Sequence, residues 1–244
     1  MRVGFIHGVM NTDNCSVVGL TIDYGPCAFM DTFEPFKVFS SIDRGGRYAY
    51  GNQPVIAQWN AMTLARCLLP LIASDTDAAI ALAQPVLDAF EDTYKAAYRR
   101  HMTAKLGIAQ AQSTDDALVA DVLDILHAQS GDFTRFFRGL TVSDDAARAE
   151  LQSPAALDGW LQRWHDRVDD SGAARTRMAG VNPSVIPRNH QVQAVIDAAT
   201  DGDLGPLDAL VEATRDPFAD RELDHPLTLA PAPEEVVHRT FCGT

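Results

Sequence analysis

The sequence predicts an α+β protein that is mostly α-helical, with a small β-hairpin platform at its N-terminal end. Two short runs rich in β-branched residues occur near the start, and apolar residues recur at helical spacing after residue 54. Of the 244 residues, 46% are hydrophobic and 22% charged, which is ordinary globular composition. We expect a platform over residues 1–54, a helical body over 55–215 and an extended or mobile tail over 216–244.

The platform consists of two predicted strands and two loops. Residues 3–6 (VGFI) and 16–22 (SVVGLTI) are the predicted strands, and they could pair as a hairpin around the polar segment HGVMNTDN. Residues 23–52 contain glycines, prolines and aromatic residues without a sustained period. A loop of that length with many aromatics predicts an ordered functional segment.

The helical body begins at Pro54, which is tolerated in a first helical turn. Apolar spacing predicts a helix to about residue 73, then a short helix capped by Asp75 or Asp77 that Pro85 interrupts, then a helix from 85 to 106 that Gly107 ends. Thr114 opens the next helix. Further helices are predicted at 132–139, 144–151, 154–168, 188–200 and 204–214, and the three tryptophans are expected in the core.

Charge and cysteine usage exclude several classes of protein. The chain has 20 Lys+Arg against 33 Asp+Glu, so its net charge of −13 disfavours nucleic-acid binding. Runs such as 67–72 are far shorter than the roughly 20 residues of a membrane span, and the start lacks a continuous apolar signal region. Cys15, Cys27, Cys67 and Cys242 form neither a disulfide scaffold nor a CxxC pattern. We expect a cytoplasmic protein without a membrane partner, in which Cys15 and Cys67 are buried.

The chemistry is expected at Asn11, Asp13, Asn14 and Asp23, the one tight group of oxygen-donor side chains in a loop and strand-end context. Carboxylate and amide oxygens suit Mg²⁺, whose octahedral shell phosphate and water can complete. The alternative is that these residues only cap turns. An apolar strand that ends in Asp23-Tyr24-Gly25 resembles the strand-to-DFG step of protein kinases, and this favours a kinase-like phosphate and metal centre.

Three stretches resemble the C-terminal half of the SelO (selenoprotein O, YdiU) protein adenylyltransferases. They are HGVMNTDNCSVVGLTIDYGPCAFMD, GRYAYGNQPVIAQWNAMTLARCLLPLI and NPSVIPRNHQVQAVIDAATDGD, the last followed by RDPF. The resemblance implies a kinase-like, pseudokinase-type C-terminal lobe. It also implies transfer of AMP from ATP to Ser, Thr or Tyr hydroxyls of proteins, with Mg²⁺, or Mn²⁺ in its place.

The resemblance assigns a role to each matching residue. Asp13 corresponds to the proton acceptor, Asn14 to a Mg²⁺ ligand, and Asp23 to the ligand of Mg²⁺ and ATP. These roles agree with the chemistry, because a carboxylate can receive the proton of an attacking hydroxyl while a bound metal offsets phosphate charge.

The chain also departs from the family pattern. It has no counterpart of the family's N-terminal half, which carries the glycine-rich loop and the phosphate-binding Lys and Arg residues, so we expect an incomplete protein. The resemblance also suggests a disulfide between Cys27 and Cys242, against two independent thiols. The alternative functions are a true kinase and an inert helical fragment or binding module.

Overall fold

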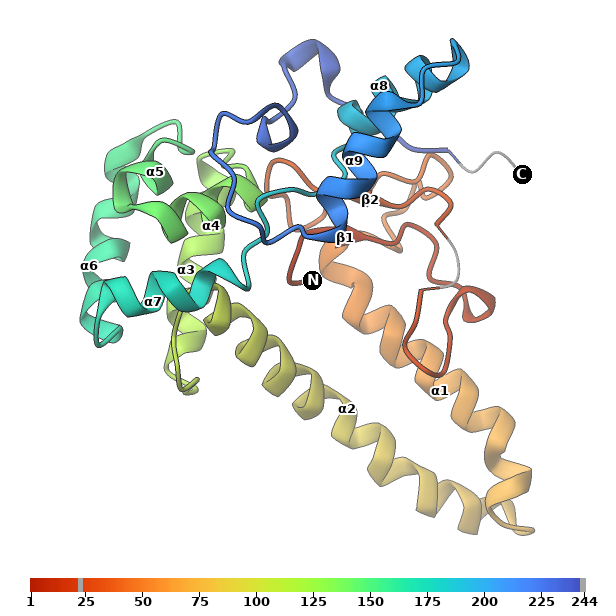
Figure 1. The fold of residues 1–244 in the computed structure, drawn as a ribbon. Coiled ribbons are helices and arrows are strands. Elements are labelled where there is room, and N and C mark those ends of the chain that lie inside the picture. The colour runs from red at the N-terminus through yellow and green to blue at the C-terminus, as the bar shows by residue number, and fades with distance from the viewer. Residues whose placement is uncertain (22–23, 242–244) are drawn as a thin grey trace. The chain divides into compact units, whose positions relative to one another are not determined.

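The computed structural model describes residues 1–21 and 24–241, which Figure 1 shows coloured along the chain. The chain forms two compact units. Apart from the undescribed positions, unit 1 comprises Met1–Phe5, Ala28–Pro35 and Arg99–His238, and unit 2 comprises Ile6–Cys27, Phe36–Tyr98 and Arg239–Thr244. The mostly helical character with a small two-stranded sheet is confirmed. The kinase-like nature of the lobe and the borders at residues 54 and 215 stay predictions.

The strand pairing differs from the predicted hairpin. β1 (Phe5–Ile6) pairs with β2 (Ala28–Phe29), and the described part of the second predicted strand, residues 16–21, contains only an isolated bridge between Cys15 and Thr21. Its apolar side chains are exposed, so this β-branched run has no buried face to hold it in a sheet. The prediction of a strand there was wrong, because β propensity alone does not hold a strand that packs against no core.

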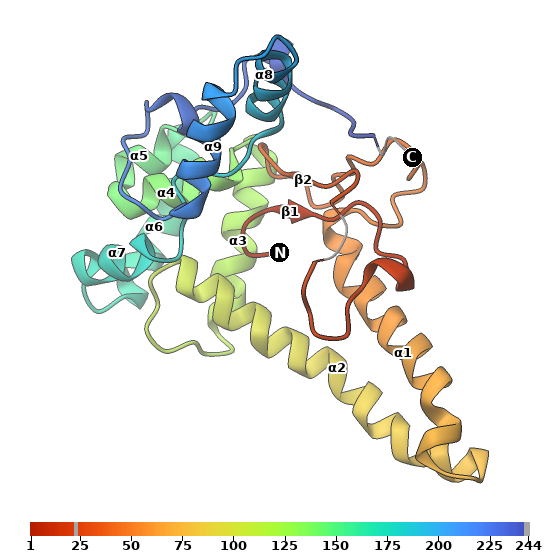
Figure 2. The ribbon, with the colours of Figure 1, turned by 45° about the vertical axis from the view of Figure 1, so that its right-hand side comes forward.

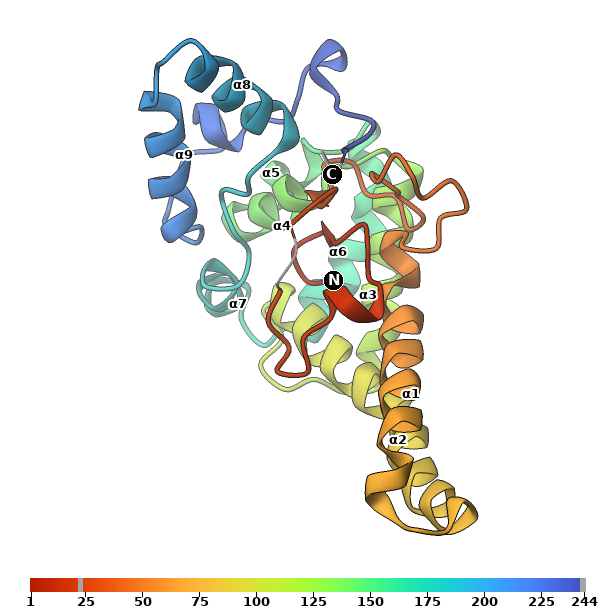
Figure 3. The same cartoon turned by 90° about the vertical axis from the view of Figure 1, so that its right-hand side faces the viewer.

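Unit 1 is built from short helices that pack around an aromatic core. Its helices are α3 (Asp115–Ala128), α4 (Phe133–Val142), α5 (Asp144–Arg148), α6 (Asp158–Arg167), α7 (Ser171–Ala179), α8 (Asn189–Thr200) and α9 (Gly205–Arg215). The predicted helices between 114 and 214 are all present with slightly shifted ends, and α7 was not predicted. Figure 3 shows α8 and α9 side by side as a helical hairpin.

The core of unit 1 satisfies its polar atoms as well as its packing. Trp160 and Trp164 are stacked with ring centroids 6.4 Å apart, and both are fully buried, as predicted. Their indole N–H groups donate to the carbonyls of Leu118 (2.8 Å) and Leu106 (2.9 Å). Because each buried indole has its hydrogen bond, the pair contributes its full apolar area without an unsatisfied donor.

A buried ion-pair cluster attaches residues 28–35 to the helices of unit 1. The Arg188 guanidinium is 1% exposed, lies 2.7 Å from a carboxylate oxygen of Asp132 and also pairs with Asp31. Asp132 in turn caps α4 by accepting from the backbone N–H of Arg135 at 2.8 Å. Removing either partner would leave a buried charge uncompensated, so the cluster fixes where this segment lies.

Residues 216–238 of the tail belong to unit 1, where a side chain of α4 holds them, and the described residues 239–241 belong to unit 2. Arg135 donates to the carbonyls of Leu223 (2.8 Å) and Thr228 (3.1 Å), while its other nitrogens hold Glu150. Only two short 3₁₀ turns, Pro226–Thr228 and Pro233–Glu235, interrupt the described tail. Backbone carbonyls that a helix would have satisfied are thus satisfied by a side chain of α4.

Unit 2 contains α1 (Gln53–Ile72) and the first part of α2 (Thr76–Lys105), which begins in unit 2 and ends in unit 1. Figures 1 and 2 show the two helices meeting at a short turn and diverging from it. α2 continues through Pro85, so the predicted interruption was wrong. The helix is exposed around this proline, so water can hydrate the carbonyl that has lost its N–H partner.

Two other expectations fail in unit 2. Trp59 is 42% exposed and Cys67 is exposed, so neither is a core residue. The stretch Tyr50–Ile72 is also long and apolar enough to cross a membrane by length and composition alone, with a mean hydropathy of 1.3 and 6% of its window buried. This stretch is longer than the runs such as 67–72 on which the expectation of no span rests. The absence of a membrane partner stays a prediction.

Candidate functional site

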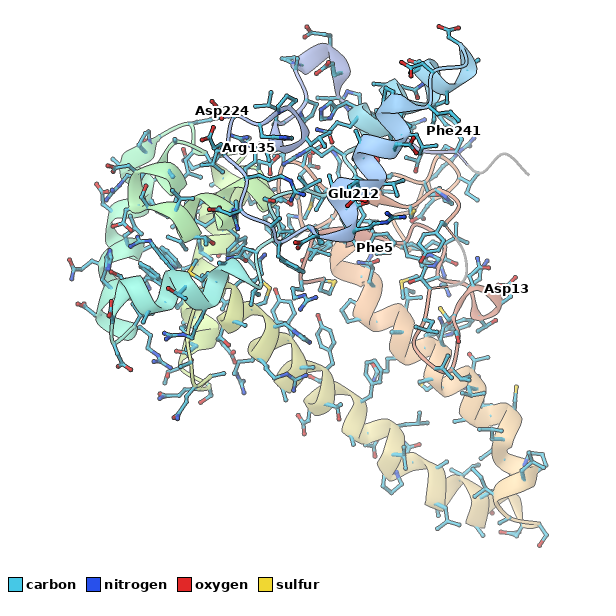
Figure 4. The ribbon with its side chains drawn as sticks, viewed as in Figure 1. Phe5, Asp13, Arg135, Glu212, Asp224 and Phe241 are labelled. Atoms are coloured by element: carbon cyan, nitrogen blue, oxygen red, sulfur yellow. The ribbon has the colours of Figure 1, made fainter. Side chains whose placement is uncertain are left out.

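The polar segment 11–14 forms a short 3₁₀ turn in unit 2. The turn spans Thr12–Asn14 and is closed by the backbone N–H of Asn14, which donates to the carbonyl of Asn11 at 3.0 Å. Asp13 is exposed on this turn, as Figure 4 shows. Its carboxylate is therefore accessible to a second molecule, while the backbone that carries it has a defined conformation.

Two side chains of α1, those of Gln53 and Asn60, contact the loop that contains this turn. The amide nitrogen of Asn60 donates to the carbonyl of Met10 at 3.1 Å and lies 3.0 Å from the thiol sulfur of Cys15. Three residues before Met10, the backbone N–H of His7 donates to the side-chain amide oxygen of Gln53 at 3.0 Å. Figure 2 shows this loop beside α1. The helix thus positions the loop from both sides.

The side chain of Asn14 has a defined orientation. Its amide nitrogen donates to the carbonyl of Val9 at 3.2 Å, within the same loop. This bond distinguishes the two ends of the amide and leaves the oxygen end to act as a ligand. A neighbouring interaction that orients a ligand in this way is typical of metal sites in proteins.

The segment 43–48 supports the turn from another side. The Tyr48 hydroxyl is hydrogen-bonded to the side-chain oxygen of Asn11. Tyr48 is held in place because the Asp43 carboxylate accepts from the backbone N–H groups of Arg47 and Tyr48, both at 2.8 Å. The Arg47 guanidinium lies over the ring of Trp59, 4.9 Å from its centroid, which places a cation in this segment.

Tyr50, which is buried, and Tyr98, which is partly buried, do not supply a base in unit 2. Burial raises the pKa of Tyr98 to about 12, and burial also raises the pKa of Tyr50 well above its ordinary value. Both hydroxyls therefore stay protonated near neutral pH. The exposed carboxylate on the turn itself is that of Asp13, the proton acceptor that the sequence predicts.

A half-open apolar groove lies between the loop and α1. Its volume is about 450 Å³, and the residues that line it are Thr12, Cys15, Ser16, Val17, Ala57, Asn60, Ala61, Thr63, Leu64 and Cys67. The side-chain oxygen of Asn60 is buried and has no hydrogen-bond partner among the described residues. The groove thus adjoins the side chain that holds both flanks of the turn.

Comparison with known proteins identifies the family. The sequence model of the family described as "Protein adenylyltransferase SelO" matches residues 1–215. The chain belongs to the SelO family. It is 52% identical over 256 residues to a protein of Rhodopseudomonas palustris (strain BisB18) named "Protein nucleotidyltransferase YdiU". Proteins with the same name in Bradyrhizobium diazoefficiens and a Ruegeria species are 48% and 47% identical. These alignments include the whole of this chain.

The SelO chain spans about half the length of the curated relatives it matches. It covers 52% of the Rhodopseudomonas and Bradyrhizobium proteins and 51% of the Ruegeria protein. The predicted resemblance to a half of these proteins is thereby confirmed. About half of the sequence of each relative therefore has no counterpart in this SelO chain.

The structure brings together some of the predicted site residues. Asn11, Asp13 and Asn14 share one turn, whereas Asp23 lies outside the described residues and its role stays a prediction. Sequence reasoning missed Tyr48 and Asn60 as supports of the turn. The available signal for Tyr48 was the polar density of GRYAYGNQP, which overlaps the start of α1.

The donor chemistry of the turn fits Mg²⁺. The described residues contain no group of three His, Cys, Asp or Glu side chains that could hold a metal. The turn offers instead one oriented amide oxygen on Asn14, which is a hard oxygen donor. Mg²⁺ is commonly held by one or two such groups together with substrate phosphates and water rather than by a full protein cage.

The predicted disulfide has one end in the described structure. Cys242 lies outside the described residues, so its pairing with Cys27 stays a prediction. The Cys27 thiol lies 3.6 Å from the carbonyl oxygen of Tyr24 and is partly buried. This contact fixes the thiol near the segment that follows Asp23.

Proposed function

We propose that this chain supplies the catalytic loop of a protein adenylyltransferase, which transfers AMP from ATP to Ser, Thr or Tyr hydroxyls of other proteins. The observation that supports it most directly is the exposed Asp13 carboxylate on a turn whose two flanks, at Met10 and Cys15, are both contacted by Asn60 of α1. The match to the SelO family model supports the choice of reaction. The curated relatives carry the broader name of protein nucleotidyltransferase.

In the proposed reaction, the acceptor hydroxyl attacks the α-phosphorus of ATP and pyrophosphate leaves. Asp13 accepts the hydroxyl proton, so a new oxygen–phosphorus bond forms as the bond to the leaving pyrophosphate breaks. Asn14 and Asp23 would hold Mg²⁺, which offsets charge on the phosphates. Tyr48 and Asn60 keep the turn in the conformation that presents Asp13.

Unit 2 also contains a cation, the Arg47 guanidinium, in the segment that supports the turn. An arginine can bind phosphate oxygens through two parallel hydrogen bonds, and its stacking on Trp59 limits the freedom that binding would remove. We therefore propose that Arg47 contacts a phosphate of the nucleotide. The remaining phosphate and adenine contacts are expected from the half of the family polypeptide that this chain does not cover.

The test uses the full-length Rhodopseudomonas relative with ATP labelled at the α or the γ phosphate. Substitution at the position aligned with Asp13, Asp13→Ala, should leave nucleotide binding intact while AMP transfer falls by about 10² to 10⁴-fold. Asp23→Ala should abolish Mg²⁺-dependent nucleotide binding measured by calorimetry. The 244-residue chain alone should give no labelled acceptor.

Asp124→Asn is the matched control, because it removes one carboxylate charge from an exposed position of α3 in unit 1. This variant should keep full transfer activity. Transfer of γ-label would instead support a kinase, and α-label transferred by the 244-residue chain alone would show that no further half is needed. Loss of nucleotide binding in Asp13→Ala with transfer chemistry unaffected would reverse the roles of Asp13 and Asp23.

A further inference from the structure

One side of α1 is apolar, regularly spaced and accessible. Ala57, Ala61, Leu64, Leu68 and Leu71 follow one another at intervals of four, three, four and three residues. We refer to these five residues as the α1 seam. Because residues three and four apart share a helix face, the seam forms one continuous stripe along α1.

The C-terminal part of the seam is exposed, and Ala57 and Ala61 face the groove that loop residues 12–17 also line. Leu64 and Leu68 are about two-fifths exposed and Leu71 is 82% exposed. α2 does not cover it, because the two helices diverge from their turn (Figures 1 and 2) and Val86 of α2 is itself 74% exposed. Contiguous exposed apolar surface on one helix face marks an interaction site.

The spacing specifies the shape of the partner. Apolar residues spaced alternately three and four positions apart are typical of helices that pack by knobs-into-holes contacts with a second helix. The small side chains of Ala57 and Ala61 line the groove of about 450 Å³, which leaves room there for larger side chains of a second helix. The occupant should therefore be an amphipathic helix with large apolar residues facing the alanines.

The charge pattern agrees with an apolar partner face. α1 contains a single charged residue, Arg66, and helical geometry places Arg66 on the side opposite the seam. A partner helix therefore needs no charged residue toward the seam. The net charge of −13 disfavours the pairing of two copies and also binding to an acidic lipid surface.

We propose that the α1 seam binds an amphipathic helix from the half of the SelO-family polypeptide that this chain does not cover. The relatives provide the length for it, since the whole chain aligns with only about half of each one. This inference does not depend on the proposed function, because the contact can form and be measured without nucleotide or transfer activity.

The first experiment measures the complex between the two halves. The 244-residue chain is coexpressed with the part of the Rhodopseudomonas relative that does not align with it, and the affinity of the purified pair is measured by calorimetry. We expect a one-to-one complex that the double substitution Leu64→Asp, Leu68→Asp weakens at least about 30-fold. Ile196→Asp, which changes an exposed apolar residue of α8 in unit 1, should leave the affinity unchanged.

The second experiment needs no separate halves. Leu71→Asp should leave the Tm of the 244-residue chain unchanged, because this side chain is 82% exposed there, but should lower the Tm of the full-length relative at the aligned position. Equal effects in the two proteins would overturn the proposal. So would a wild-type chain that forms no complex, or that uses the seam to form a dimer in sedimentation or to bind phosphatidylserine vesicles.

Discussion

The two units of this chain bury their apolar residues to very different extents. In unit 1, Phe137, Trp160 and Trp164 are almost completely excluded from water, and in unit 2 the apolar side chains of α1 and early α2 largely face it. The difference is not one of composition, because α1 is among the most apolar segments of the chain. It teaches that helical spacing identifies a face to be covered, but not which segment covers it.

The largest contrast is expected from truncating one apolar side chain in each unit. Phe137 is fully buried and lies 5.3 Å from Phe136 between ring centroids, so Phe137→Ala should lower the unfolding free energy of unit 1 by about 3–5 kcal/mol. Leu71→Ala in unit 2 should change stability by less than about 0.5 kcal/mol.

Urea unfolding followed by tryptophan fluorescence can measure both. Trp160 and Trp164 report on unit 1, and Trp59 reports on unit 2 if the other two are replaced by Phe. A loss at Leu71→Ala as large as that at Phe137→Ala would mean that the exposed face of α1 is covered in this chain. The comparison between the units would then be wrong.

A second contrast uses two glycines with the same backbone conformation. Gly107 has φ +68° and a Cβ there would lie 2.4 Å from the carbonyl oxygen of Ala174, whereas Gly19 has φ +74° and no neighbouring atom within 4 Å. Gly107→Ala should cost at least about 2 kcal/mol, because backbone strain and overpacking add. Gly19→Ala should cost about 1 kcal/mol, from strain alone.

Equilibrium urea unfolding of the two variants measures this difference. Equal losses at the two positions would indicate that the backbone near Ala174 moves aside without cost. Such a result would remove the evidence that unit 1 is tightly packed at the C-terminal end of α2.

A third expected effect depends on pH and concerns Lys105. Its ammonium is fully buried, lies 3.0 Å from the side-chain oxygen of Asn182 and 4.2 Å from the centroid of the Phe137 ring, yet burial lowers its pKa to about 7. Between pH 7 and about 10.5 the unfolded chain therefore binds more protons at this site than the folded chain. The contribution of Lys105 to stability should rise with pH across that window.

Lys105→Met removes this dependence. The unfolding free energy of wild type minus that of the variant should increase with pH, by up to about 1.4 kcal/mol per pH unit between pH 7 and 10. Lys95→Met, at an exposed lysine of unit 2, should give a difference with little slope. A flat difference for Lys105→Met would show that the buried amine keeps its proton through this range.

Helices were predictable where a buried face repeats. α3, α4 and α6 each bury residues at helical spacing, and their limits follow from capping groups such as Asp132. α7 was missed because it buries only Ala174 and Met178 and so shows no apolar stripe. The sequence does contain a capping residue for α7, namely Asp170. In the structure its carboxylate accepts from the backbone N–H of Gly172 at 2.7 Å.

Pairings between distant segments were not predictable in this way. The turn with Asp13 and Asn14 follows from local residue types and from the family resemblance. Its supports do not, because Tyr48 and Asn60 reach it from 37 and 45 positions away in sequence. β2 is too short to give a strand pattern, so its pairing with β1 depends on packing that a single sequence does not display.

The interleaving of the two units also affects when they can fold during synthesis. Near its C-terminal end, Thr240 pairs with Ser40 in a parallel bridge and donates to the carbonyl of Pro26 at 2.6 Å. The ribosome adds Thr240 to the chain about 200 residues after Pro26 and Ser40. The loops of unit 2 therefore cannot form that contact until most of the chain has been synthesised. Contacts between residues so far apart slow folding, and the apolar surface of α1 is accessible to chaperones throughout that interval.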